Sequence, residues 1–206
     1  MLIMELAAEI HQNAVEHGWW DEKRAFVEII ALIHSEWSEA LEETRAGRPL
    51  SYRVCLKEPE ETVICGQVDE TFCARTGREK ECKYYGKKPE GIAVELVDGC
   101  IRILDYLARC GYFEGMAKIY PERGKLTAED FCAQDEMPDA PMSLPEAVSK
   151  LHAMTTDAYR MGNVHLENAC RLAMRWVKQQ GMDPVQLILE KHAYNKTRPF
   201  KHGKKF

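Results

Sequence analysis

Residues 94–107, VELVDGCIRILDYL, place three carboxylates along one narrow face of a predicted helix. Glu95, Asp98 and Asp105 stand at i, i+3 and i+10, with Arg102 at i+7, and most of the other side chains are apolar or small. A helix that is apolar around most of its circumference is buried, so we expect this stripe in the interior. Because a buried carboxylate is costly unless it is paired or bound to a cation, the pattern predicts a cation site.

A second acidic stripe follows the sequence AFVEIIALIHSEWSEALEET, in which Glu36, Glu39 and Glu43 stand at i, i+3 and i+7 beside an apolar face. Taken alone, such a stripe is most often a solvated face of a helix. If the two helices pack side by side, the three acids of the first stripe meet Glu36 and Glu39. With Arg102 as the single base among them, the formal charge is −4. Two divalent cations would balance that charge, and the alternative is a ladder of ion pairs around Arg102.

The candidate ligands in both stripes are carboxylate oxygens, which suit Mg²⁺ or Mn²⁺ better than Zn²⁺ or Cu²⁺. A di-iron helical bundle would instead carry Glu-x-x-His motifs, and the sequence contains none. A separate set of four thiols could hold a structural Zn²⁺, although it lacks the Cys-x₂-Cys pairs typical of zinc sites, and free thiols in a loop are the alternative. This set comprises Cys55, Cys65, Cys73 and Cys82.

Helical periodicity dominates the sequence and strand signals are weak, so we expect one all-α domain over residues 1–206. Asp21 should cap the second helix, and Asp183 should cap the last. Two irregular stretches are expected, a Cys-containing insert at about 48–89 and a segment at about 115–142. The expected helices cover residues 2–17, 21–46, 90–110, 143–161, 164–180 and 184 to about 198.

The C-terminal end of the chain is basic, whereas the rest is acidic. Residues 191–206 contain six Lys or Arg and no acid, so the other 190 residues, with 22 bases and 33 acids, carry a formal charge of −11. This distribution disfavours a general nucleic-acid binder and favours a small anionic ligand held between a cation and a basic clamp. Lys191, Asn195 and Arg198, at i, i+4 and i+7, could form that clamp. The alternative is that these bases serve only the helix dipole and solubility.

Length and composition are those of an ordinary globular protein, with 206 residues, 45% of them hydrophobic and 30% charged. Neither an N-terminal signal sequence nor a run of about 18 apolar residues is present in the sequence. We therefore expect a cytoplasmic protein without a membrane segment. In that compartment its eight cysteines should be free thiols or metal ligands rather than disulfides.

These motifs together resemble those of the MazG-like, all-α nucleoside triphosphate pyrophosphohydrolases. The motifs in question are Glu36-x-x-Glu39, Glu95-x-x-Asp98 and Lys191-x-x-x-Asn195-x-x-Arg198-Pro199. The likeness extends over residues 18–49 and 89–107 and over the C-terminal motif, in the form found in phage and prophage members. One position departs from the family pattern Glu-Glu-x-x-Glu, because Ser35 stands where the first Glu would be.

The resemblance implies a MazG-like helical bundle that hydrolyses a (d)NTP to a (d)NMP and pyrophosphate. It implies a set of catalytic Mg²⁺ ligands: Glu36, Glu39, Glu95 and Asp98. In the family, a water attacks the α-phosphorus, and the site usually forms in a homodimer or a higher assembly. The nucleotide would contact residues of the C-terminal motif: Lys191, Asn195, Lys196 and Arg198. Trp20 could stack on the base, although packing beside the helix start is the commoner role of such a residue.

Three other interpretations stay open from the sequence. A phosphoribosyl-ATP pyrophosphatase would use related chemistry on another substrate. A non-catalytic regulator would bind a nucleotide through a degenerate site, and the departure at Ser35 is the observation that favours it. A helical interaction module would hold both acidic stripes in ion pairs. Pyrophosphate release from nucleotides with and without Mg²⁺ separates these classes.

Overall fold

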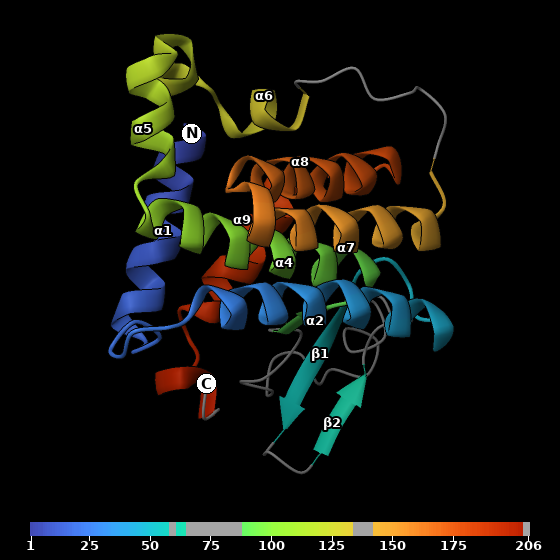
Figure 1. The fold of residues 1–206 in the computed structure, drawn as a ribbon. Coiled ribbons are helices and arrows are strands. Elements are labelled where there is room, and N and C mark those ends of the chain that lie inside the picture. The colour runs from blue at the N-terminus through green and yellow to red at the C-terminus, as the bar shows by residue number, and fades with distance from the viewer. Residues whose placement is uncertain (58–60, 65–87, 134–141, 204–206) are drawn as a thin grey trace.

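The computed structural model describes residues 1–57, 61–64, 88–133 and 142–203, and it is predominantly helical (Figure 1). Within these ranges, no helix is long and apolar enough to cross a bilayer. The helices are α1 (Ile3–Glu16), α2 (Phe26–Arg45), α4 (Ile92–Arg109), α5 (Tyr112–Ile119), α6 (Ala128–Ala133), α7 (Leu144–Met161), α8 (Val164–Gln179) and α9 (Pro184–Asn195). Short 3₁₀ segments follow α5 at Pro121–Lys125 and α9 at Phe200–Gly203.

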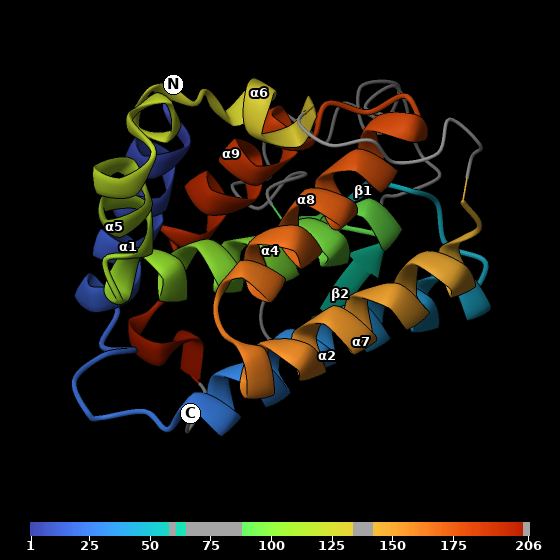
Figure 2. The same ribbon diagram turned by 45° about the horizontal axis from the view of Figure 1, so that its top comes forward.

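Helix α4 lies at the centre of the bundle, in contact with α1, α2, α8 and α9 (Figure 2). Its apolar circumference explains this position, because Leu96, Ile103, Leu104 and Leu107 are all fully buried. Helix α7 completes the bundle by packing against α2 and α8. The buried position that the sequence predicts for α4 is therefore confirmed, and the acidic stripe on α4 must be stabilised inside the protein.

Two helices that carry acidic residues approach closely because of a glycine. A Cβ atom on Gly99 of α4 would overlap the ring of Trp37 on α2. Trp37 is fully buried, and its indole N–H donates to the Thr155 hydroxyl of α7 at 3.0 Å. The ring is thus fixed from the far side, and only a residue without a side chain fits opposite it. This contact sets the spacing between the two acidic stripes.

Two helix ends differ from those expected. Helix α2 begins at Phe26 rather than after Asp21, because Glu28 accepts the N–H of Ala25 and completes the first turn there. Helix α9 ends at Asn195 rather than near Arg198, because the N–H groups of Thr197 and Arg198 donate to carbonyls three residues back instead of four. The expected cap at Asp183 is confirmed, with its carboxylate accepting the N–H groups of residues 185 and 186 at 2.9 and 3.1 Å.

The segment expected to be irregular between the acidic helices contains a small antiparallel sheet. Strands β1 (Tyr52–Lys57), β2 (Glu61–Ile64) and β3 (Lys88–Glu90) are ordered β2-β1-β3, with Tyr52 opposite Glu90. Gly91 joins β3 to α4 with φ +117°, and a Cβ atom there would lie 2.8 Å from the Leu50 carbonyl oxygen. The all-α prediction therefore holds for the bundle but not for the insert.

The proposed zinc ligands fall largely outside the described residues. Cys65, Cys73 and Cys82 lie outside them altogether, and only the backbone of Cys55, within β1, is described. Four cysteines elsewhere in the described ranges are free thiols: Cys100, Cys110, Cys132 and Cys170.

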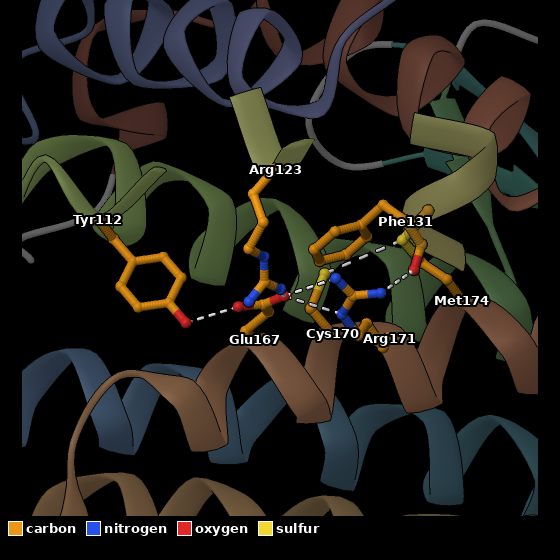
Figure 3. Close-up of polar contacts among 7 residues, drawn as sticks. All are labelled: Tyr112, Arg123, Phe131, Glu167, Cys170, Arg171 and Met174. Atoms are coloured by element: carbon orange, nitrogen blue, oxygen red, sulfur yellow. Dashed lines mark hydrogen bonds and ion pairs between the residues drawn. The ribbon is translucent and has the colours of Figure 1, made fainter. Parts of the chain in front are cut away.

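Of the second stretch expected to be irregular, about 115–142, the described residues 115–133 are mostly short helices held by a buried ion-pair network (Figure 3). Glu167 of α8 is 2% exposed and accepts hydrogen bonds from Tyr112 at 2.5 Å, from Arg123 and from Arg171. Arg171 also donates to the Phe131 carbonyl at 2.7 Å. These bonds attach α5, the 3₁₀ segment and α6 to α8, which sequence periodicity in such short helices does not reveal.

Candidate functional site

The two acidic stripes meet where α2 packs against α4. Glu36, Glu39 and Glu95 form a carboxylate cluster, in which one oxygen of each lies within 4.8 Å of the others. Glu36 and Glu95 are buried, 5% and 6% exposed, whereas Glu39 is exposed. Glu36 and Glu39 stand one turn apart on α2, and Glu95 comes from α4. Three oxygen ligands from two helices at this spacing can hold a divalent cation.

The environment of the carboxylate cluster opposes its negative charge. Burial, with the nearby Asp98 carboxylate, raises the pKa of Glu95 to about 9. Burial also raises the pKa of Glu36, and the carboxylates of Asp98 and Glu39 add to this effect, while Arg102 opposes it. Because desolvation and repulsion both disfavour the charged forms, a cation bound among these oxygens would relieve both costs.

Asp98 lies beside the cluster and is held by a buried lysine. Its carboxylate accepts from Lys191 Nζ at 2.8 Å, and this ammonium also donates to the Pro89 carbonyl at 3.1 Å. Burial alone would lower the pKa of Lys191, but the carboxylates of Asp98, Glu95 and Glu90 have the larger, opposite effect. Its pKa is therefore raised above the usual range, and the side chain stays charged. Lys191 thus fixes the position of Asp98.

A second base lies inside the acidic group, and this changes the expected charge balance. Arg102 forms an ion pair with Glu36 across the contact between α4 and α2. The four ionised carboxylates of Glu36, Glu39, Glu95 and Asp98, with Arg102 and Lys191, leave a formal charge of −2. The charge of −4 expected from the sequence included Asp105 and left out Lys191; Asp105 instead accepts from Trp20 and bonds His11. With both bases counted, one divalent cation balances these six groups.

A cavity of about 150 Å³ opens beside the carboxylate cluster. Residues of α1, the loop after it, α2, α4, α9 and the segment after α9 all contribute to its wall. Its acidic residues are Glu36, Glu39, Asp98 and Asp105. Its arginines are Arg24, Arg102 and Arg198. Acidic and basic groups therefore line one partly open cavity, as an anionic ligand bound through a cation would require.

Several buried polar atoms of the cavity wall have no hydrogen-bond partner. Among the described residues, such side-chain atoms occur on four residues, and all four line this cavity. They are Asn13 Oδ1, Arg24 Nη2, both ring nitrogens of His192, and Asn195 Oδ1. A buried polar group without a partner costs free energy, so these atoms indicate a polar ligand or ordered water in the cavity.

His192 presents a neutral ring to this space. Burial lowers its pKa to about 4, and the charge of Lys196 contributes. At neutral pH the ring therefore offers one N–H donor and one nitrogen acceptor. Asn13 and Asn195 add amide groups, and each of the three residues is at least 91% buried. These three residues of the cavity wall can thus hydrogen bond to an uncharged polar group.

The two adjacent tryptophans point to different places. Trp19 lines the cavity, with the Arg24 guanidinium 5.3 Å from its ring centroid. Trp20, the residue expected to contact a ligand, instead donates its indole N–H to Asp105 at 2.9 Å. Asp105 also bonds His11 at 2.7 Å. The structure therefore places Trp19, rather than Trp20, on the cavity wall.

The expected basic clamp is only partly assembled. Asn195 and Arg198 line the cavity, whereas Lys196 is exposed and Lys191 faces Asp98. The segment after α9 is tied to the end of α1, because a ring nitrogen of His17 donates to the Arg198 carbonyl at 3.0 Å. This bond holds Arg198 at the cavity although α9 has already ended.

Sequence reasoning missed Asn13, Arg24 and His192 as candidate binding residues. Asn13 carried a usable signal, since it continues the apolar face of α1 three residues after Ile10, where a core residue is expected. No comparable signal marks Arg24, which lies in the loop before α2. His192 follows the expected clamp residue Lys191 directly, but periodicity does not show that its ring reaches the cavity.

The fold and the site define a predominantly helical protein with a carboxylate cluster beside a polar cavity. No protein-family model, curated protein or solved structure matches this chain.

Proposed function

We propose that this protein is a Mg²⁺-dependent nucleotide pyrophosphohydrolase that cleaves a (d)NTP to a (d)NMP and pyrophosphate. One observation carries the proposal: three carboxylates converge beside a cavity whose wall holds arginines and buried polar atoms without partners. A nucleoside triphosphate offers matching parts, a chain of phosphates for a cation and arginines, and a polar nucleoside for the amides and the imidazole.

The metal-binding part of the proposal assigns Glu36, Glu39, Glu95 and Asp98 to Mg²⁺, with Mn²⁺ as a substitute. The donor set fits, because all four supply carboxylate oxygens, and with all four ionised one divalent cation balances the residual charge of −2. When bound, the cation would neutralise charge on the phosphates and activate a water for attack at the α-phosphorus. Lys191 orients Asp98 for this task rather than touching the nucleotide.

The nucleotide-binding part assigns the arginines to the phosphates and the uncharged residues to the nucleoside. Arg24 and Arg198 line the cavity and have the planar donor geometry that suits phosphate oxygens. Asn13, His192 and Asn195 would hydrogen bond to the base or sugar and so satisfy their buried atoms. The ring of Trp19 could stack on the base, in the role that the sequence suggested for Trp20.

A nucleotide-binding regulator without catalysis is the second candidate, and Ser35 favours it. Ser35 lines the cavity, and its hydroxyl donates to the Leu32 carbonyl at 2.8 Å, so it supplies no carboxylate where the resembled family has one. Such a regulator would bind the same nucleotides with no turnover. A phosphoribosyl-ATP pyrophosphatase would use the same site on a larger nucleotide.

A homodimer or higher assembly and a cytoplasmic location are further parts of the proposal. Apolar side chains are exposed near the start of α2 and the end of α7: Val27 is 56%, Tyr159 58% and Met161 59% exposed. Phe26 stacks on Tyr159 at 6.2 Å between ring centroids, so the start of α2 and the end of α7 lie side by side. Exposed apolar surface of this kind favours self-association. Sedimentation of the purified protein tests this part.

Pyrophosphate release is the test of the proposed function. Canonical and modified ribo- and deoxyribonucleotides, with phosphoribosyl-ATP, would be incubated with the protein in the presence and absence of Mg²⁺. We expect Mg²⁺-dependent pyrophosphate release from at least one nucleotide, and loss of release in Glu39→Gln. Glu114→Gln is the matched control, because Glu114 is exposed on α5. Binding without release in every case would favour the regulator, and neither binding nor release would refute both.

A further inference from the structure

Arg102 forms an ion pair that crosses from one acidic helix to the other. Its Nε donates to Glu36 Oε1 on α2, although Asp98 and Asp105 lie one turn away on its own helix. The carboxylate that it contacts belongs to the cluster of Glu36, Glu39 and Glu95. One base of the protein is therefore paired with a carboxylate that a bound cation would use.

A cation in the cluster would weaken this ion pair for two physical reasons. The Glu36 carboxylate would have to be shared between the metal and the guanidinium. The positive charges of the cation and of Arg102 would also repel across a short distance in a site from which water is largely excluded, since Glu36 is 5% exposed. Arg102 and the cation are thus competitors for the same carboxylate.

The guanidinium has a second place to bind. Its side chain is 30% exposed and lines the cavity with Arg24 and Arg198, so it is not locked in the interior. A guanidinium released from Glu36 keeps five N–H donors in one plane, which match the oxygens of a phosphate group. Phosphates held by the cation would lie next to Arg102, because the cation shares Glu36 with it.

We propose that Arg102 exchanges partners during substrate binding, holding Glu36 in the metal-free protein and a phosphate oxygen of the substrate once the cation is bound. Arg102 would therefore lower the affinity for the cation alone and raise the affinity for the cation with phosphates. Cation and phosphates would then bind cooperatively, because each removes a cost that the other faces. This inference rests on the proposed function.

The test measures two affinities with opposite expected changes. Binding of Mn²⁺ alone is measured from the electron paramagnetic resonance signal of the free ion. The pH is about 8, because carboxylates ionise more readily there than at lower pH. Binding of the Mn²⁺–pyrophosphate complex is measured by calorimetry. Arg102→Gln should bind Mn²⁺ alone about tenfold more tightly, since a nearby positive charge is gone. It should bind Mn²⁺–pyrophosphate at least about tenfold more weakly, since a charge-assisted contact is lost. Arg45→Gln, with the same charge change on an exposed residue at the end of α2, should alter neither affinity.

Unchanged or weaker Mn²⁺ binding in Arg102→Gln overturns the proposal, because a purely structural ion pair would weaken both affinities. If that variant does not fold, Arg102→Lys is the test. Its retained charge should keep the affinity for Mn²⁺ alone within about threefold of wild type. The loss of the planar guanidinium should still weaken binding of the Mn²⁺–pyrophosphate complex. Loss of neither affinity in Arg102→Lys also overturns it. A failure of the proposed function looks different, since wild type would then bind no Mn²⁺, or Glu39→Gln would bind it as wild type does.

Discussion

Glu95 provides the clearest link between stability and metal binding in this protein. Its pKa lies at about 9 in the folded chain, raised from 4.5 by burial and by the Asp98 carboxylate. The folded protein therefore holds a proton that the unfolded chain releases. The stability that this difference provides is complete below about pH 4.5 and is lost as the pH rises through about 9. Without metal, the protein should become steadily less stable across this range.

Glu95→Gln removes this loss of stability with rising pH, because glutamine cannot ionise in the unfolded chain. It keeps the shape and the hydrogen-bond donor of the protonated acid. At pH 7 the unfolded chain gains by ionising Glu95, and over the interval from 4.5 to 7 this amounts to about 3 kcal/mol, at 1.36 kcal/mol per pH unit. We expect the metal-free variant to be more stable by up to that amount. For a chain of this length, the melting temperature should rise by roughly 6–12 °C.

Thermal denaturation between about pH 5 and pH 9, with and without Mg²⁺, measures the effect. Mg²⁺ should stabilise the wild type most at high pH, because it keeps Glu95 ionised and relieves its repulsion, and should stabilise Glu95→Gln far less. Glu114→Gln serves again as the exposed control. The reasoning is refuted if Glu95→Gln melts at or below the wild-type temperature without metal and responds to Mg²⁺ as the wild type does.

Three further changes test the surrounding structure. Asp98→Asn would leave the buried Lys191 ammonium without its carboxylate, so it should lower the free energy of unfolding by about 3 kcal/mol or more. Urea denaturation measures this change, and an unchanged midpoint would contradict the ion pair. Gly99→Ala should lower the free energy of unfolding by about 1–3 kcal/mol, because the new methyl group clashes with Trp37, and should weaken Mg²⁺ binding by separating α2 from α4. Gly115 has open space around it, so Gly115→Ala should change neither stability nor Mg²⁺ binding. His34 and His152 stack with their Nδ1 atoms 2.7 Å apart, and burial lowers the pKa of both. The unfolded chain therefore takes up more protons below about pH 6.5, so stability should fall as the pH drops, and His152→Gln should make this decline shallower.

The Asp98 result would reverse an expectation from sequence alone. Repulsion among the acidic residues suggests that Asp98→Asn should stabilise the metal-free protein. The structure reverses this expectation, because Lys191 comes from α9 and pairs with Asp98 on α4. The two residues are 93 positions apart, and periodicity within each helix does not show which partner of another helix a side chain meets.

Most of the bundle could be predicted because its helices carry strong local signals. The apolar circumference of α4 predicted its burial, and Asp183 followed by Pro184 predicted the start of α9. The errors occurred where tertiary contacts outweigh local pattern. Asp21 is a good capping residue, but the chain uses the turn at Ala25 instead. The strands at 52–57 and 88–90 pair across a long insertion, which a weak local strand signal does not reveal.

The carboxylate cluster could be predicted, whereas most of the polar wall could not. Glu36, Glu39 and Glu95 stand at helical spacing beside apolar faces, so two adjacent helices were enough to bring them together. The polar wall of the cavity combines Asn13 from α1, Arg24 from a loop and His192 from α9. Their convergence depends on how three separate segments pack around α4, and no spacing within the sequence encodes it.

The central claim is that water attacks the α-phosphorus of a nucleotide held at the carboxylate cluster. Hydrolysis of the best substrate in ¹⁸O-labelled water, with mass spectrometry of both products, tests this claim directly. The proposed mechanism predicts one ¹⁸O atom in the nucleoside monophosphate and none in pyrophosphate, with no turnover in Glu39→Gln. Label in pyrophosphate, release of orthophosphate, or full activity of Glu39→Gln would contradict it.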